Sequence, residues 1–442
     1  TSYNQVGILT GSHADDEDDY FGFSVATSAD GNHIIVGAYA DEIPGSIDKT
    51  GVVYVYDRVG TTFTQVGIIT GNDISERFGY SVATSADGNH IIVGAQYPTG
   101  LAGAVYVYDR VGTTTSFTQV GILKGTYAVD SFDKFGDYFA CSADGSTIIV
   151  CAPEDETPDG TGGSGLVYVY DRVGSTFTEV GILTGYYDST SSSFGKSVAC
   201  SVDGNVIVIG SEQHLSGSSG QSGMVYVFDR QYSGIGATFI PVGILTGSHA
   251  SDAYDNFGYS VATSADGNHI IVGAYDDELP GGPNTGVVYV FDREYSVGIG
   301  TTFTQVGILT GSYADADDYF GGSVACSADG NIIVVGAYKD ETDATDLGPA
   351  TADHCGLVYV FNRQGNNFTE VGILTGSHGD GDDRFGESVA CSADGKHIIV
   401  GAYKDEHPSS GSESGLVYVF DQDVDTKSIL RSTDEQNVII DA

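Results

Sequence analysis

The chain lacks tryptophan, has one methionine and carries few basic residues: 17 Lys and Arg stand against 60 Asp and Glu, a formal charge of −43 over 442 residues. So acidic a surface repels phosphate backbones and anionic lipid headgroups, which excludes nucleic acid and membrane surfaces as electrostatic partners. No run of about 18 apolar residues occurs, so membrane insertion is not expected. Apolar residues at helical spacing are also missing over ten residues or more, which argues against helices.

Seven near-copies of one unit fill the chain instead. Each contains Phe-Gly, then Ser-x-Asp-Gly, then a run that mostly ends in Val-Gly-Ala, then Val-Tyr-Val followed by Tyr or Phe. All but the last copy close with Val-Gly-Ile. The Phe-Gly pairs are spaced 57, 57, 59, 63, 63 and 65 residues apart and begin at Phe21, Phe78, Phe135, Phe194, Phe257, Phe320 and Phe385. A period of this size is typical of a supersecondary unit that cannot bury its apolar surface alone.

Each unit holds four apolar runs bounded by turn-forming residues. In the first copy the runs are Phe21–Ala26, Ile34–Ala38, Val52–Tyr56 and Phe63–Ile69. Runs of this length, rich in Val, Ile, Tyr and Phe, are typical of strands. Four antiparallel strands per unit, repeated around an axis, predict an all-β fold: a seven-bladed β-propeller of four-stranded blades.

The two ends of the repeat region complement each other. The last copy supplies three strands and ends at Phe420, whereas residues 3–11 repeat the fourth-strand motif. We therefore expect the N-terminal strand to complete blade 7 and to close the ring, with the propeller spanning residues 1–422. Residues 423–442 lie outside the repeat. They are interpreted as a tail or linker, or as a strand that docks on a neighbouring subunit.

The repeated Phe-Gly, Asp-Gly, Val-Gly-Ala and Gly-x-Val-Tyr-Val-Tyr elements resemble FG-GAP repeats, the units of integrin α-subunit propellers. The likeness is closer to the FG-GAP branch of secreted and surface proteins of microbes and algae, and it covers roughly residues 3–422. This resemblance implies an extracellular or cell-surface protein with an adhesive, binding or scaffold role, often with calcium.

The predicted strand order places the loop before Phe-Gly and the loop after Val-Gly-Ala at one end of every blade, here called the loop face. Two acidic positions recur there. Entry acids stand two residues before the Phe, and exit acids stand three residues after the Ala. The copies that carry both contain Asp19 and Asp41, Asp133 and Asp155, Asp255 and Asp277, Asp318 and Asp340, and Asp383 and Asp405.

Paired carboxylates at one blade end suit calcium, which prefers several oxygen ligands, so these ten aspartates are candidate metal ligands. The alternative is that they accept backbone N–H bonds and hold the loops, as Asp commonly does in turns. The loop segment Asp276–Glu278 adds further acids at this face.

The calcium loop of integrin propellers is not carried over. It resembles Asp-x-Asp-x-Asp-Gly-x-x-Asp between the first two strands, but around Asp30-Gly31 the other acidic places hold Ala26, Ser28 and Ile34. One carboxylate per turn is too few for calcium. The Asp-Gly pairs are interpreted as hairpin turns in which Gly takes a positive φ.

Three other recurring features are interpreted structurally. Cys141, Cys200, Cys326 and Cys391 share one repeat position with Thr in other copies, which favours a small, half-buried packing site, although pairing between neighbouring blades stays open. Asp57-Arg58 and its equivalents are interpreted as a turn with a surface ion pair. The face tyrosines Tyr39, Tyr275, Tyr338 and Tyr403 either cover the blade tops or stack on sugar rings.

These observations favour a non-catalytic extracellular propeller that engages protein partners or other copies of itself through its acidic loop face, with calcium as the candidate cofactor. A glycan-binding module is the first alternative. A polysaccharide-acting enzyme is the second, and it requires a polar cluster, unique to one region of the ring, in the axial channel.

Overall fold

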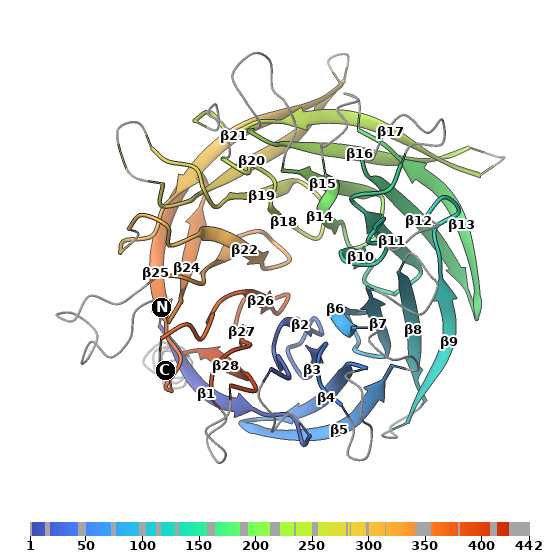
Figure 1. Ribbon diagram of the computed structural model, residues 1–442. Helices are drawn as coiled ribbons and strands as arrows, with labels where there is room; N and C mark the ends of the chain where they lie inside the picture. Colours follow the sequence, from blue (N-terminus) through green and yellow to red (C-terminus); the bar gives the residue numbers. More distant parts are fainter. Residues whose placement is uncertain are drawn as a thin grey trace, which may run out of the picture.

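The computed structural model contains seven four-stranded antiparallel sheets arranged around a central axis (Figure 1). The structure describes residues 2–423 except 14–17, 43–49, 72–76, 97–102, 112–115, 129–131, 157–163, 186–192, 213–221, 234–235, 250–254, 280–281, 283, 298–299, 314, 341–354, 379–380 and 407–412. The expected tail or linker, residues 423–442, therefore lies outside the described residues apart from Asp423. Within the described part, every regular element is a strand. The predicted seven-bladed propeller is confirmed.

The strands run outward from the axis in chain order. Blade 1 comprises β2 (Ser24–Thr27), β3 (His33–Ala38), β4 (Val52–Val59) and β5 (Thr62–Thr70), and blade 2 comprises β6 (Phe78–Thr84), β7 (His90–Ala95), β8 (Ala104–Arg110) and β9 (Phe117–Leu123). Blade 3 comprises β10 (Phe139–Cys141), β11 (Thr147–Ala152), β12 (Leu166–Val173) and β13 (Thr176–Leu183), and blade 4 comprises β14 (Phe194–Cys200), β15 (Val206–Ser211), β16 (Met224–Ser233) and β17 (Gly236–Leu245). Blade 5 comprises β18 (Ser260–Thr263), β19 (His269–Ala274), β20 (Val287–Ser296) and β21 (Gly300–Leu309), and blade 6 comprises β22 (Phe320–Cys326), β23 (Ile332–Ala337), β24 (Leu357–Gln364) and β25 (Asn367–Leu374). Blade 7 comprises β26 (Ser388–Cys391), β27 (His397–Ala402), β28 (Leu416–Gln422) and, from the other end of the chain, β1 (Tyr3–Leu9).

Ring closure occurs where the sequence predicts it. Strand β1 pairs antiparallel with β28, from Tyr3 opposite Gln422 to Leu9 opposite Val417, and the two strands lie side by side in Figure 1. The last blade therefore has the same four-stranded form as the others, and no blade is left with its neighbour-facing surface exposed.

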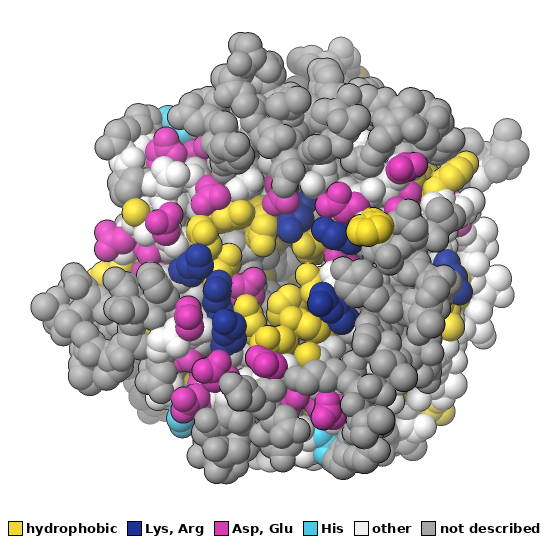
Figure 2. Space-filling view, viewed as in Figure 1, with side chains coloured by type: hydrophobic (Ala, Val, Ile, Leu, Met, Phe, Trp, Pro, Cys, Tyr) yellow, Lys and Arg dark blue, Asp and Glu magenta, His cyan; other side chains and the backbone are white. Residues whose placement is uncertain are grey.

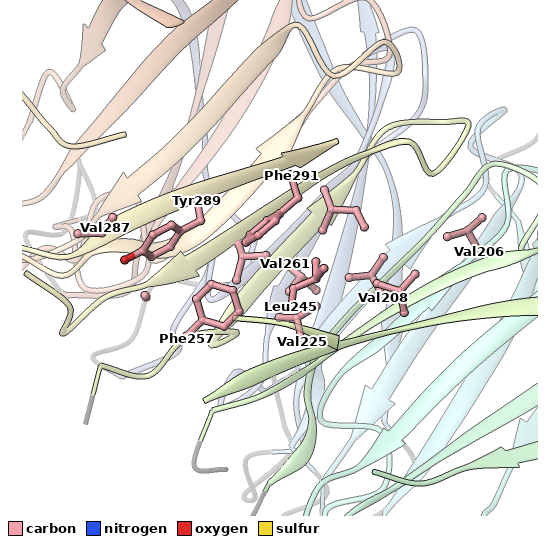
Figure 3. Packing of buried hydrophobic residues seen from close by; sticks show 13 residues of the cluster. Val206, Val208, Val225, Leu245, Phe257, Val261, Val287, Tyr289 and Phe291 are labelled. Carbon is pink, nitrogen blue, oxygen red and sulfur yellow. The ribbon is translucent and has the colours of Figure 1, made fainter. Parts of the chain in front are cut away.

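The apolar core lies between blades. Each of the seven buried clusters combines residues of two neighbouring blades, so every blade covers the next. Figure 3 shows the cluster in which Val206, Val208 and Val225 of blade 4 pack toward Phe257 and Tyr289 of blade 5. The repeated Phe is fully buried and packs against the Tyr of the third strand, with ring centroids 5.4 Å apart for Phe257 and Tyr289.

The glycine after each repeated Phe is required by its backbone. Gly79 has φ of +86°, a left-handed conformation that side chains other than glycine rarely adopt, and the corresponding glycines of the other copies are similar. The Asp-Gly turns also behave as expected, with φ of +71° at Gly31. The glycines of the Phe-Gly and Asp-Gly pairs thus occupy backbone positions that only glycine accepts without strain.

The Asp-Arg pairs differ from the surface ion pairs that we expected. Arg110 of blade 2 donates to both carboxylate oxygens of Asp57 in blade 1, at 2.8 and 2.5 Å, and His33 lies 2.7 Å from the same carboxylate. The Arg110 side chain is buried. These pairs therefore join neighbouring blades, because the third strand of one blade ends beside that of the next. The pairs found in the described structure are Arg58–Asp421, Arg110–Asp57, Arg172–Asp109, Arg230–Asp171, Arg293–Asp229 and Arg363–Asp292.

The junction between blades 6 and 7 replaces this ion pair with two neutral residues. Asn362 stands at the Asp position of blade 6 and Gln422 at the Arg position of blade 7, so neither charge is left buried without its partner. Gln422 instead donates to the Tyr3 hydroxyl at 3.2 Å. The paired change agrees with an interaction that crosses from each blade to the next.

Two expectations about covalent and membrane structure are also resolved in the described residues. All six cysteines are free, so the neighbouring-blade disulfides that the sequence left open are not formed. Among the residues that the structure describes, no helix is long and apolar enough to cross a bilayer.

Outer strands touch through a glycine and an aromatic ring. A Cβ added at Gly67 of β5 would overlap the Phe117 ring of the next blade, and the same contact recurs around the ring. At the junction between blades 6 and 7, here called the closing junction, the aromatic residue is Tyr3. Its ring lies 3.6 Å from a Cβ added at Gly372. The closing junction is thus the roomiest of the set.

We predict that Gly67→Ala destabilises the protein by about 1–3 kcal/mol, because the new methyl group overpacks a blade interface. Gly372→Ala is the matched control at the equivalent position. It should change the free energy of unfolding by less than about 1 kcal/mol, since the methyl group has space. Denaturant unfolding of both variants measures the difference, and equal losses would contradict this account of the closing junction.

Candidate functional site

The ten candidate aspartates are all buried beneath the loop face. Their burial is deeper than a set of solvated loop ligands would show. Each exit acid closes its own loop: the backbone N–H of Gly51, for example, donates to the carbonyl of Asp41 at 3.0 Å. The same backbone bond recurs at Asp155, Asp277, Asp340 and Asp405.

Each exit acid also accepts a hydrogen bond from the buried Tyr of the third strand. The distance is 2.5 Å in all five blades, between Tyr54 and Asp41, Tyr168 and Asp155, Tyr289 and Asp277, Tyr359 and Asp340, and Tyr418 and Asp405. Burial and the adjacent carboxylate raise the pKa of these phenols well above the ordinary value. These bonds are compatible with the loop-holding role that we considered as the alternative to metal binding.

One pair of entry and exit acids lies close to a third carboxylate. In blade 5, oxygens of Asp255, Asp277 and Glu278 lie within 4.8 Å of one another, the one such group of three found in the described part of the chain. Asp277 Oδ1 is buried and has no hydrogen-bond partner among the described residues, whereas Oδ2 is held by Tyr289. Burial raises the pKa of Asp277 to about 6. Hard cations favour such a set of carboxylate oxygens.

A second site surrounds the axis, at positions outside the sequence-based predictions. The residue after each Phe-Gly faces the axial hollow, and these seven residues differ in chemistry: Phe23, Tyr80, Asp137, Lys196, Tyr259, Gly322 and Glu387. The sequence does contain a signal for this site, because the position after Phe-Gly varies most within an otherwise regular motif. Residues that face an opening escape the packing constraints that keep the neighbouring letters alike.

The residue before each repeated Phe is also positioned by the backbone. All seven have φ between +47° and +61° although none is glycine: Tyr20, Arg77, Lys134, Ser193, Asn256, Tyr319 and Arg384. Non-glycine residues in this region carry strain, and such strain clusters at functional sites. Their carbonyls accept a bond from the N–H three residues later, which forms a tight turn at the mouth of the axial channel.

A polar network occupies the mouth between blades 2 and 5. Gln96 donates to Asp137 at 2.8 Å and accepts from Arg77 at 2.8 Å. The Lys196 ammonium lies 3.8 Å from the Glu212 carboxylate and 4.6 Å from the centre of the Tyr259 ring. These groups break the repeat, since Glu212 and Gln96 stand where most other copies have Tyr. The channel therefore holds the unique polar cluster that an enzyme or a specific binding site needs.

Two carboxyl groups in this hollow are poised near neutral pH. Burial raises the pKa of Asp137 to about 7, against the opposing effects of Gln96, Lys134, Lys196 and Arg77. Burial likewise raises the pKa of Glu387 to about 7, although four cations favour its charged form. The deeper part of the channel differs, because it is lined by the Val, Ala, Thr and Cys of the inner strands, which repeat around the ring.

A sequence profile of the FG-GAP repeat matches residues 3–56, 63–108, 244–291, 303–361 and 368–420, more than half of the chain. The chain belongs to the FG-GAP repeat family. FG-GAP repeats are typical of extracellular or surface proteins, and the family is typically non-enzymatic. A comparison with curated proteins finds no match.

The FG-GAP matches leave out residues 109–243, although blades 3 and 4 within this range have the same fold. Asp137, Tyr138, Lys196 and Glu212 all lie in that range. Tyr138 replaces a serine found in the other copies, and Cys151 replaces the Gly of Val-Gly-Ala. The part of the ring that departs from the family pattern thus contributes Asp137, Tyr138, Lys196 and Glu212 to the axial mouth.

We predict that Asp137 and Glu387 make stability fall as pH rises from about 4 to about 7. An ordinary carboxyl loses its proton near pH 4 in the unfolded chain, whereas these two keep theirs to about pH 7 when folded. Their protonated forms carry no folding penalty below pH 4, and the full penalty of two buried charges is present above pH 7. The double variant Asp137→Asn/Glu387→Gln should therefore be more stable than wild type at pH 8, by about 1–3 kcal/mol per group, with little difference at pH 4.

Asp394 provides a control of opposite sign. Its pKa is lowered to about 2, with hydrogen bonds from Lys396 and Ser392 outweighing burial. Asp394→Asn should therefore lose stability at pH 8. Thermal unfolding from pH 4 to 8 measures all three proteins, and parallel pH profiles for wild type and the double variant would contradict the assignment.

Proposed function

We propose that this FG-GAP propeller is a non-catalytic adhesive protein of the cell exterior. It engages protein partners or other copies of itself through the loop face, and a calcium ion held in blade 5 stabilises that face. The family supports an extracellular binding role. The loop face carries the variable, acidic connections, and binding surfaces commonly form on such loops over a rigid scaffold.

The observation that carries the calcium part is the Asp255–Asp277–Glu278 cluster. Three converging carboxylates offer one oxygen each toward the six to eight that calcium takes, and loop carbonyls or water supply the rest. The buried Asp277 Oδ1 has no hydrogen-bond partner among the described residues, and a cation would satisfy it. The other eight aspartates remain candidate ligands, and the bonds of the four exit acids among them also fit loop support.

Glycan binding is a second candidate function, favoured by the aromatic residues around the axial mouth. Tyr39 and Tyr403, two of the face tyrosines, contact Tyr20 with ring centroids 5.2 and 5.4 Å apart. Tyr275 contacts Tyr259 at 4.5 Å. Such rings offer apolar faces to a sugar while their hydroxyls reach water.

We predict that millimolar calcium raises the melting temperature of the wild-type protein relative to chelator. A ligand present at about 100 times its Kd stabilises the folded state by about 2.7 kcal/mol. Asp277→Asn and Asp255→Asn should remove most of this calcium-dependent increase, because each deletes a charged ligand. Asp394→Asn, at a turn on the opposite face, is the control and should keep it.

The binding part of the proposal is tested separately by sedimentation of the wild-type protein with calcium and with chelator. Calcium-dependent self-association that Asp277→Asn abolishes would support engagement of other copies. The metal assignment would be overturned if the melting temperature did not change with calcium. It would also be overturned if the calcium-dependent increase in melting temperature persisted in both Asp277→Asn and Asp255→Asn.

A further inference from the structure

The few cations of this acidic protein gather around the axial opening. Asp137 is influenced by Arg77, Lys134 and Lys196, and Glu387 by Arg384, Lys196, Lys339 and Lys404. Figure 2 shows Lys and Arg side chains around the central hollow, with Asp and Glu farther out on the same face. Six of the 17 basic residues thus surround one opening.

These cations differ in whether an acid is already paired with them: Lys134 and Lys196 lie 3.2 and 3.8 Å from the carboxylates of Glu154 and Glu212. The structure shows no ion pair between a described residue and the side chain of Lys404 or Arg384, and Arg384 Nε is buried without a hydrogen-bond partner there. Glu387 is surrounded by four cations but accepts no side-chain hydrogen bond within the described part of the chain. By contrast, the arginines at the opposite face each hold an Asp of the neighbouring blade. The mouth therefore retains positive charge that is available to an anion.

Aromatic rings flank the cations on two sides. Tyr20, Phe23, Tyr39, Tyr80 and Tyr403 form one continuous group of ring contacts from blades 7, 1 and 2. A second group from blades 5 and 6 contains Tyr259, Tyr275, Tyr319 and Tyr338. A ligand that enters the mouth meets apolar ring faces and positive charge together.

The size and surroundings of the hollow limit the kind of anion. Its volume of about 320 Å³ is at the lower end of small-molecule sites, and apolar inner-strand residues line the channel beneath it. The ligand must therefore enter end-on. An extended polyanion would lie across the acidic outer part of the loop face, where repulsion opposes binding. These features favour a ligand whose negative charge is confined to one end.

We propose that the axial mouth binds the acidic end of a glycan, a terminal sugar ring that carries a carboxylate. The carboxylate faces Lys196, Arg384 and Lys404, where charge-assisted hydrogen bonds are available. The sugar ring packs its apolar face on the flanking aromatic side chains, and its hydroxyl groups meet the Ser side chains of the inner strands that line the hollow. This site is distinct from the blade 5 carboxylates and requires no calcium.

Protonation of the hollow should strengthen this binding. Asp137 is faced by Gln96, Lys134, Lys196, Arg77 and Tyr138, and Glu387 by Arg384, Lys196, Lys339, Lys404 and several tyrosines. When the two carboxyl groups become neutral below about pH 7, the cations around them remain charged. A carboxylate sugar, which stays ionised there, gains attraction as the pH falls from 8 to 6.

The test is a titration of the intact protein with oligosaccharides that end in glucuronate or galacturonate, with neutral oligosaccharides of the same length as the comparison. Ligand-observed NMR and calorimetry measure binding in chelator, so failure of the calcium proposal does not affect the result. We expect binding of the acidic sugars, at least about tenfold weaker binding of the neutral ones, and tighter binding at pH 6 than at pH 8.

Lys196→Met and Arg384→Gln should each weaken acidic-sugar binding by about tenfold or more, since each removes one charged donor. Lys396→Gln, which removes a cation from a turn on the opposite face, should leave it unchanged. Thermal unfolding confirms that each variant folds, and Arg384→Gln keeps the test valid if Lys196→Met does not. Equal binding of acidic and neutral sugars, selective binding of an acidic peptide instead, or full affinity in both folded variants would overturn the proposal.

Discussion

Circular closure is the constraint on which the rest of this structure depends. The pairing of β1 with β28 allows blade 7 to cover blade 1 and blade 6 to cover blade 7. Because every apolar cluster is shared between two blades, an open ring would expose the face of its first and last members to water. The antiparallel strand order of every blade places the entry and exit loops at one end of the ring, where the acidic loops and the axial mouth share a face.

The repeat separates stability from recognition. The regular residues of the repeat fill the interfaces: the buried Phe and its Tyr partner, the glycines that accept unusual backbone angles, and the Asp and Arg that join neighbouring blades at every junction but one. Positions that face the axis take no part in these interfaces, and their residues vary from Phe23 to Lys196 to Glu387. A symmetric scaffold thereby supports an asymmetric opening, with its charged groups concentrated in blades 2, 3, 4 and 7.

Much of the fold was predictable, because the same pattern of strands and turns occurs in seven copies along the chain. Residues 3–11 supply the one strand that the last copy lacks. The candidate site was predictable only in part. The repeat indicated which aspartates share a face, but whether three carboxylates converge depends on loop conformation, and they do so at Asp277 and not through the regular motif alone. The Asp-Arg pairs were misinterpreted for a related reason: adjacency along the chain says nothing about which blade each side chain faces.

The sequence by itself determined the number of blades, their strand order, the strand that closes the ring and the family, since these follow from local periodicity and from repetition. The tertiary structure alone decided which residues meet across blades and around the axis. Arg110 with Asp57, and Asp137 with Gln96, come from different copies, and their distances depend on how neighbouring blades pack. Side chains that face a shared opening are brought together by ring geometry, which no single copy encodes.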